Sequence, residues 1–192
     1  MNTVSQSTTC SVPDDINFAA RKRLLSLPGE PLLNADWDQL LMMHYEVDPV
    51  LLQKVVPFEL ELYRGSAWIS LVAFTLRDMR LRRFGRLGAA LFSPIATHEF
   101  LNVRTYVKVR EETGIYFLAE WLSNRLSVLL GPTLFGLPYR FGRIAYQHDT
   151  FKSTGIVSGS VCSSDHKDRF EYAARLLADD DFREAESGSL TE

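Results

Sequence analysis

The stretch FLNVRTYV, residues 100–107, places side chains that could bind an anion at every second position. If it forms a β-strand, Asn102, Arg104 and Tyr106 share one face, because successive strand side chains point to opposite faces. An arginine can hold a carboxylate through two parallel hydrogen bonds. We therefore predict that these three residues line a polar ligand pocket. The alternatives left open are a solvent-facing side and a structural carboxylate paired with Arg104.

Histidine and carboxylate side chains occur close together at two places, but neither pattern predicts a metal site. His44 and Glu46 alternate onto one face of a predicted strand, and His98 directly precedes Glu99. A His-x-Glu pair lacks the further fixed ligands that a protein zinc site uses. We therefore predict packing or surface roles for these residues, with no metal and no other cofactor.

Sequence motifs for covalent or nucleotide chemistry are missing from the chain. It contains no Gly-x-Ser-x-Gly motif for a serine nucleophile. Cys162 falls on a predicted strand, where we expect a buried packing role. The glycines at positions 131, 136 and 142 are too widely spaced for a phosphate-binding loop.

An arginine-rich segment supplies an alternative function. Positive charge is concentrated at Arg77, Arg80, Arg82, Arg83 and Arg86. Such a segment could contact an anionic surface. However, the net charge of the chain is −3, which argues against nucleic-acid binding driven by bulk electrostatics. We expect no nucleic-acid partner and no membrane partner, and the sequence leaves open whether identical chains assemble.

Length and composition predict one ordinary globular domain. The chain has 192 residues, 46% hydrophobic and 23% charged, which is typical of a soluble globule. The first 15 residues lack the basic start and apolar core of a signal peptide. Two cysteines cannot build a disulfide framework, so we expect a cytoplasmic location. We expect residues 1–15 to be a disordered tail, 16–178 the domain and 179–192 an acidic tail.

Strands outnumber helices in the local patterns. The alternation of apolar residues predicts strands over 36–47, 59–63, 67–76, 139–147, 151–162 and 169–176, and two more around a turn at 111–114. Helices are predicted over 16–27, over 49–56 after the Asp48-Pro49 cap, and from a Ser123 cap to about Leu134. Pro132 should end or kink the last of these helices. A hairpin turn is predicted at Arg64-Gly65, and 77–97 is predicted to be looser. The pattern predicts an α+β fold built on a mainly antiparallel sheet or barrel.

Four stretches, in their order and spacing, resemble a known bacterial family. They are HYEVDPVLLQKVVPFELELYRGSAWISLVAF, HEFLNVRTYV, GIYFLAEWLSNRLSVLLG and FGLPYRF. The family is the domain of unknown function 2071, which resembles the acetoacetate decarboxylases. The resemblance implies a cone-like antiparallel β-barrel with an internal pocket and short helices packed outside. It also implies a further segment after Gly188-Ser189-Leu190, so we expect the chain to be C-terminally truncated.

The resemblance places Tyr139 and Arg140 where the decarboxylases carry two lysines, one of which forms a Schiff base. Tyrosine cannot form an imine, and arginine stays protonated. The resemblance also places Glu99 at the position of a pocket glutamate. We therefore expect an acetoacetate decarboxylase-like protein that binds a small polar or anionic ligand through Arg104, Arg140, Asn102 and Tyr106, without the Schiff-base lysine. If it is an enzyme, Glu99 and Tyr139 are the candidate acid–base residues. The alternative within this fold is a non-catalytic ligand sensor.

Overall fold

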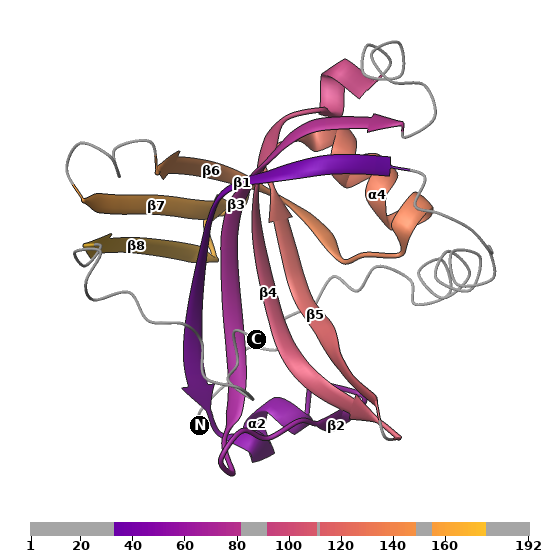
Figure 1. Ribbon diagram of the computed structural model, residues 1–192, viewed down its shortest axis with the longest axis vertical. Helices are drawn as coiled ribbons and strands as arrows, with labels where there is room; N and C mark the ends of the chain where they lie inside the picture. Colours follow the sequence, from indigo (N-terminus) through magenta and orange to yellow (C-terminus); the bar gives the residue numbers. More distant parts are fainter. Residues whose placement is uncertain (1–32, 82–91, 111, 149–154, 176–192) are drawn as a thin grey trace, which may run out of the picture.

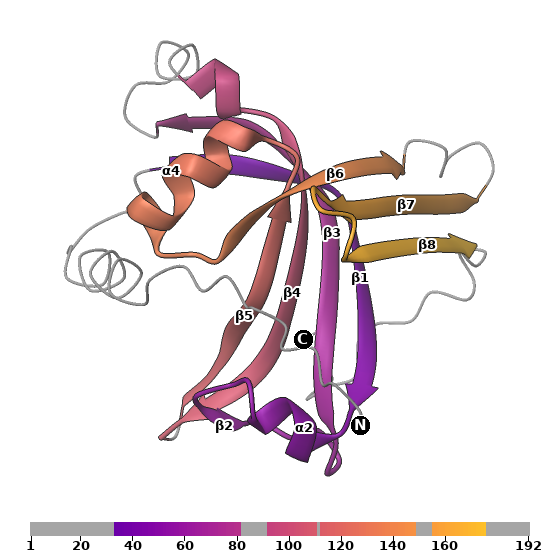
Figure 2. The same cartoon turned by 180° about the vertical axis from the view of Figure 1, so that it is seen from behind.

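A curled, half-barrel sheet dominates the computed structural model, which describes residues 33–81, 92–110, 112–148 and 155–175. The long, curved strands β1, β3, β4 and β5 run side by side (Figure 1). Strands β6, β7 and β8 project to one side of them, and helix α4 lies on the other side, as Figure 2 also shows. Helix α2 and strand β2 lie near one end of the long strands.

The elements follow one another along the chain with short connections. Their bounds are β1 Leu33–Val47, α2 Pro49–Gln53, β2 Glu59–Leu60, β3 Ala67–Leu81, the 3₁₀ helix η1 Ser93–Ile95, β4 His98–Val109, β5 Glu112–Leu122, α4 Arg125–Phe135, β6 Tyr139–Gln147, β7 Ile156–Ser163 and β8 Arg169–Arg175. The sheet order is β1-β3-β4-β5-β6-β7-β8, with β2 paired to β4. All pairs are antiparallel except β5 with β6, where the chain passes through α4 and returns in the same direction. The expected mainly antiparallel α+β architecture is confirmed.

Both faces of the central strands are buried, as the continuous apolar run of β3 predicts. On one face, which we call the α4 face, Val72, Phe74 and Leu122 pack with Val128 of α4. On the opposite face, which we call the β7 face, Ala73 and Leu101 pack against Val161 of β7. Val72 and Ala73 are adjacent in sequence, and each is 0% exposed.

Two turns and caps form as their residue types predict. The Asp48 carboxylate accepts a hydrogen bond from the backbone N–H of Val50 at 2.7 Å, which begins α2 with Pro49 in its first turn. Arg64 and Gly65 both have positive φ, 54° and 86°, as the central residues of a tight type I′ turn require. Tyr63 and Ser66 bond to each other across this turn.

The strands on either side of this turn, however, do not pair with each other. β2 pairs with β4, through Glu59 with Lys108 and Leu60 with Val107. The predicted hairpin is therefore wrong in its pairing. Leu60 packs with Leu52, Val56 and Val107 in an apolar cluster, and this packing draws β2 to β4.

Strand β3 is longer than predicted, since it continues through Arg77 to Leu81. Its charged end pairs with β1, where Asp36 lies opposite Arg77 in the register. Opposite charges on neighbouring strands stabilise pairing, so this segment is strand rather than a loose connection. The predicted loop between 77 and 97 is wrong up to residue 81. Residues 82–91 lie outside the described residues.

Helix α4 differs from its prediction at both ends. Its N-cap is Asn124, whose Oδ1 accepts from the N–H groups of Leu126 and Ser127. Ser123 does not cap the helix, because its hydroxyl donates to the Glu99 carboxylate instead. The helix also passes through Pro132 and ends at Phe135, with Gly136 as its C-cap at a φ of 64°. Since Gly136 N–H donates to Pro132 O at 3.0 Å, the last turn closes despite the proline.

The predictions for strands 139–147 and 169–176 agree with β6 and β8. The predicted helix over 16–27 and both predicted tails lie outside the described residues. Among the described helices, none has the length and apolar character needed to cross a membrane.

Candidate functional site

A row of polar side chains crosses three strands on the α4 face. His44 of β1 lies opposite Ser70 of β3, and Ser70 lies opposite Arg104 of β4. Neighbouring strands are about 4.8 Å apart, so these residues from three distant segments become lateral neighbours. Asn102 and Tyr106 lie on either side of Arg104 along β4, on the same face. The structure therefore brings together the three β4 residues that the sequence analysis grouped.

A chain of hydrogen bonds joins His44 to Tyr106 through Ser70. The Nδ1 atom of His44 is 2.7 Å from the Ser70 hydroxyl. The same hydroxyl is 2.8 Å from the Tyr106 hydroxyl. Ser70 is completely buried, so both bonds are shielded from water. The chain holds the His44 ring in a fixed orientation next to the Arg104 side chain.

The Arg104 guanidinium reaches across β3 to β1. Its Nη2 atom lies 3.7 Å from the sulfur of Met42, a weak hydrogen-bond acceptor. Its Nε atom is buried and has no hydrogen-bond partner among the described residues. None of the ion pairs between described residues includes Arg104. This half-buried cation is therefore without a carboxylate from the described part of the chain.

Further buried polar atoms around Arg104 also have no partner among the described residues. They are His44 Nε2, Trp68 Nε1 and Asn102 Oδ1. Asn102 is only 4% exposed, and Trp68 lies on the same face of β3 as Ser70. Because a buried polar group without a partner is destabilising, their gathering on one face calls for an explanation. A polar ligand would supply the missing partners.

The electrostatic environment keeps His44 neutral. Burial lowers the pKa of His44 below its ordinary value, and the nearby Arg104 charge lowers it further. A neutral imidazole can donate from one nitrogen and accept at the other. At neutral pH the positive charge of this row is therefore that of Arg104.

Tyr139 lies on the same side of the sheet, where it packs against the apolar cluster of that face. Its ring packs edge-on against Phe100, with a centroid distance of 6.0 Å. Burial raises the pKa of the Tyr139 hydroxyl far above its ordinary value, and the charge of Glu120 raises it further. The hydroxyl therefore stays protonated at neutral pH and can donate a hydrogen bond.

Two of the predicted site residues lie on the other side of the sheet from Arg104. The Glu99 carboxylate accepts a hydrogen bond from Ser123. Burial raises the pKa of Tyr146 on the β7 face, and the nearby Tyr172 and the Glu99 charge raise it further. Arg140 is exposed, with its guanidinium 5.7 Å from the centre of the Trp121 ring. Trp121 belongs to the β7-face cluster. The structure thus separates Glu99 and Arg140 from Asn102, Arg104 and Tyr106.

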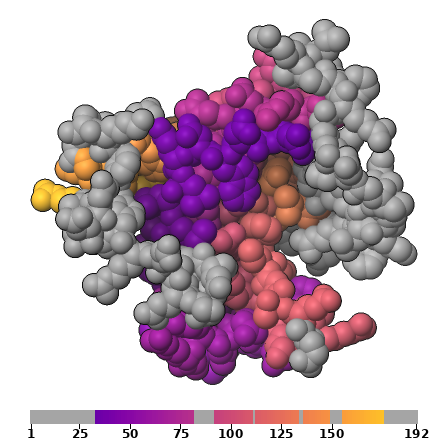
Figure 3. All heavy atoms as spheres, in the orientation of Figure 1, coloured from indigo at the N-terminus to yellow at the C-terminus, as the bar shows by residue number. Residues whose placement is uncertain are grey.

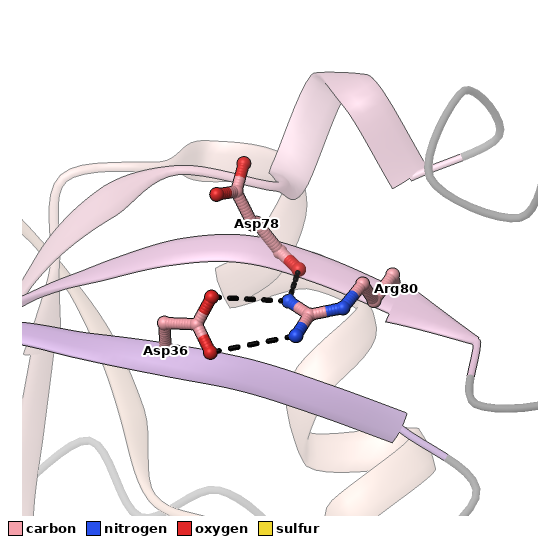
Figure 4. A network of polar contacts seen from close by, with 3 residues as sticks. All are labelled: Asp36, Asp78 and Arg80. Carbon is pink, nitrogen blue, oxygen red and sulfur yellow. Dashed lines mark hydrogen bonds and ion pairs between the residues drawn. The ribbon is translucent and has the colours of Figure 1, made fainter. Parts of the chain in front are cut away.

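The arginine-rich segment is partly neutralised within the sheet. Arg80 donates to both carboxylate oxygens of Asp36, at 3.2 and 3.4 Å, and to the Asp78 carbonyl at 2.7 Å (Figure 4). Arg77 pairs with Asp38 at 2.7 Å. These contacts join β3 to β1. The predicted Arg82, Arg83 and Arg86 lie outside the described residues.

The histidine and carboxylate pairs considered for a metal do not gather with further ligands. In the described part of the chain, no group of three or more His, Cys, Asp and Glu side chains is placed to hold a metal ion. Glu46 instead accepts a hydrogen bond from Ser66. His98 is 4% exposed and lies against Phe100, with ring centroids 4.8 Å apart.

Two open hollows lie elsewhere on the surface. One, of about 460 Å³, lies over the face of β6–β8 that includes Ser158, Ser160 and Glu171. The other, of about 530 Å³, lies between α2 and β2 and is lined by residues such as Val50 and Leu62. Neither hollow contains a predicted site residue, so the predicted internal pocket stays a prediction.

Figure 3 shows atoms of β1 and of the β4–β5 pair at the surface between the grey segments.

Local sequence patterns did not reveal that β1 and β3 contribute to this row. A packing or surface role was predicted for His44, and no site role was predicted for Ser70 or Trp68. The usable signal was polar residues interrupting an apolar run, Trp68-x-Ser70 on one face of β3. Strand pairing, which joins positions 44, 70 and 104, is not visible in local patterns.

Known proteins share this architecture at low sequence identity. Acetoacetate decarboxylase from Legionella pneumophila has a TM-score of 0.53 and 15% identity, over 83% of this chain and 56% of that one. The enduracididine biosynthesis enzyme MppR has a TM-score of 0.59 and 17% identity, over 77% of this chain and 56% of that one. An acetoacetate decarboxylase-like enzyme from Sphingomonas wittichii RW1 has a TM-score of 0.55 and 20% identity, over 81% of this chain and 63% of that one. These similarities show the acetoacetate decarboxylase-like fold.

Sequence comparison identifies relatives of unassigned function. The uncharacterised protein YqjF of Bacillus subtilis (strain 168) is 36% identical over 122 residues, 62% of this chain and 48% of YqjF. The chain therefore spans about half the length of this relative. The model of the DUF2071 family, "Uncharacterized conserved protein (COG2071)", matches residues 34–192. The chain, with its acetoacetate decarboxylase-like half-barrel, therefore belongs to the DUF2071 family.

Proposed function

We propose that this protein binds a small organic carboxylate on the α4 face, with Arg104 as the principal anion-binding residue. The observation that carries the proposal is the half-buried Arg104 guanidinium. It has no ion-pair partner among the described residues and is surrounded by buried polar atoms without partners. A carboxylate would supply two acceptor oxygens in the geometry that a guanidinium favours. It would also compensate the charge that burial otherwise destabilises.

The proposal favours a carboxylate over a metal or an inorganic cofactor. The atoms without partners include the N–H groups of Arg104 and Trp68, which need acceptors. They also include the Asn102 oxygen, which needs a donor, and a His44 nitrogen that can serve either purpose. A small organic molecule can satisfy such a mixed set. Four residues of β4 and β6 were predicted to bind the ligand. The proposal keeps Asn102, Arg104 and Tyr106 and leaves out Arg140, which lies on the opposite side of the sheet.

We propose further that the protein acts without the Schiff-base lysine of the decarboxylases. By resemblance, Tyr139 and Arg140 occupy the positions of those lysines, and neither can form an imine. Lys54 and Lys167 are exposed, and Lys108 lies near the end of β4 beside the exposed Val109. Lys22 and Lys152 lie outside the described residues. Binding alone would make the protein a sensor, whereas turnover would require Tyr139 or another protonated group to donate to the ligand.

Thermal denaturation with a panel of small carboxylates tests the binding proposal. We expect at least one carboxylate to raise the melting temperature of the wild-type protein, since a ligand that binds only the folded state stabilises it. Arg104→Met keeps the length and apolar stem of the side chain but removes the charge. We expect it to weaken binding about 30-fold, equivalent to about 2 kcal/mol.

Arg143→Met is the matched control, because Arg143 is exposed on β6. The control should bind the carboxylate as the wild type does. Sodium chloride at equal ionic strength separates specific binding from general salt stabilisation. Equal loss of binding in both variants, or no loss in Arg104→Met, would exclude Arg104 as the anion-binding residue.

A further inference from the structure

The environment of His44 indicates a second contact beyond the carboxylate site. Its Nδ1 is held at 2.7 Å by the fully buried Ser70 hydroxyl. Its Nε2 is buried and has no hydrogen-bond partner among the described residues. One nitrogen is therefore used for orientation, and the other is left for a different group.

The hydrogen-bond chain can run in either direction. Ser70 has one hydroxyl hydrogen, which it gives to His44 or to Tyr106. If Tyr106 donates to Ser70 and Ser70 donates to Nδ1, the neutral His44 carries its proton on Nε2 and can donate to a ligand. If Nδ1 donates to Ser70 and Ser70 donates to Tyr106, Nε2 becomes an acceptor. His44 can therefore meet either a donor or an acceptor without changing its charge.

Arg104 and His44 lie close to each other on the α4 face, on either side of Ser70 in the strand register. The guanidinium reaches Met42 at 3.7 Å, and Met42 and His44 are two residues apart on one face of β1. Burial lowers the pKa of His44, and at this distance the Arg104 charge lowers it further. A molecule held by Arg104 would therefore place its neighbouring atoms near the imidazole.

We propose that His44 is a second ligand-contacting residue of this site and that its Nε2 binds a polar group adjacent to the ligand's carboxylate. The inference rests on the proposed carboxylate-binding function. It assigns His44 a specificity-determining role, with Ser70 and Tyr106 as the positioning residues. The ligand class is then a carboxylate that carries a hydroxyl or carbonyl group on the neighbouring carbon.

Isothermal titration calorimetry with three matched carboxylates tests the inference. Propanoate, lactate and pyruvate share a three-carbon skeleton and differ only in bearing hydrogen, hydroxyl or carbonyl at the second carbon. We expect the wild type to bind lactate or pyruvate about tenfold more tightly than propanoate, the value of one additional hydrogen bond. His44→Asn, which is too short to reach the Nε2 position, should bind all three with the affinity of propanoate.

His166→Asn is the matched control, because His166 is exposed at the β7–β8 turn and Asn tolerates its φ of 59°. Unchanged propanoate affinity in His44→Asn shows that the variant is folded and that Arg104 still binds. If the wild type binds all three equally, or if His44→Asn keeps the preference, the inference is wrong while the proposed function stands. If propanoate binding is lost in a folded His44→Asn variant, His44 supports Arg104 and the inference is also wrong. If no carboxylate binds, both proposals fail together.

Discussion

Arg104 differs from Arg77, Arg80 and Arg140 in what its side chain contacts. Arg77 and Arg80 pair with aspartates of β1, and Arg140 lies over the ring of the half-buried Trp121. Arg104 instead reaches a thioether sulfur, which gives little compensation for a buried charge. Its position therefore favours a role in binding over a role in holding the strands together.

Two histidines, the half-buried His44 and the buried His98, predict a pH dependence of stability. Burial lowers the pKa of both His44 and His98 from 6.5 in the folded protein. As the pH falls below about 6.5, the unfolded chain takes up these protons first. The free energy of unfolding should therefore decrease on acidification, and the loss should stop below the folded-state pKa values.

Urea denaturation at several pH values checks this expectation. His98→Asn should show a shallower decrease in unfolding free energy between pH about 8 and about 5 than the wild type. His166→Asn is the matched control for the substitution itself, because the His166 side chain is exposed. An equally steep decrease in His98→Asn would mean that this ring does not titrate with folding.

At the scale of elements, α4 is positioned by a close contact with β6. Gly131 lies against the ring of Tyr139, and a β-carbon at that position would overlap the ring atoms. The contact allows Tyr139 to sit between the helix and Phe100 of β4. The missing side chain of Gly131 therefore sets the distance between α4 and the sheet.

Gly131→Ala should destabilise the protein although alanine favours helices. Overpacking of a core contact costs about 2 kcal/mol, which exceeds the gain in helix propensity of about 1 kcal/mol. We expect a lower midpoint of urea unfolding. Gly114→Ala is the control, because its β-carbon would lie 4.0 Å from Val107, an ordinary contact. Equal stability of Gly131→Ala and wild type would show that Tyr139 can move away freely.

The whole molecule shares its fold with enzymes but only part of their length. It covers 56% of the Legionella decarboxylase chain at 15% identity, and this identity carries the fold alone. The chemistry of those enzymes does not transfer with the fold, since function depends on the residues of the site. Here the candidate site residues on the α4 face are an arginine, a histidine and hydroxyl groups.

Borohydride trapping tests the absence of imine chemistry in the whole protein. We expect no reduced adduct by mass spectrometry after incubation with acetoacetate and borohydride. By resemblance, Tyr139 and Arg140 occupy the positions of the decarboxylase lysines, and neither side chain can form an imine. The Legionella acetoacetate decarboxylase, treated in parallel, controls for the trapping reaction. A stoichiometric adduct on any lysine, including Lys108, would contradict the proposal.

The sequence by itself determined the local features of this protein. Alternation placed Asn102, Arg104 and Tyr106 on one face of β4, because the two-residue period of a strand is a local property. It also determined the Asp48 cap, the Arg64-Gly65 turn and the limits of β6. Family-specific stretches were sufficient to identify the fold.

Only the tertiary structure decided which of these residues meet. It joined His44 and Ser70 to Arg104 and placed Glu99 and Arg140 on the other side of the sheet. It also paired β2 with β4 instead of β3. The physical reason is that strand register depends on side-chain packing between segments distant in sequence. Local propensity therefore predicts a strand and its two faces, whereas packing across the sheet selects the neighbours that form the site.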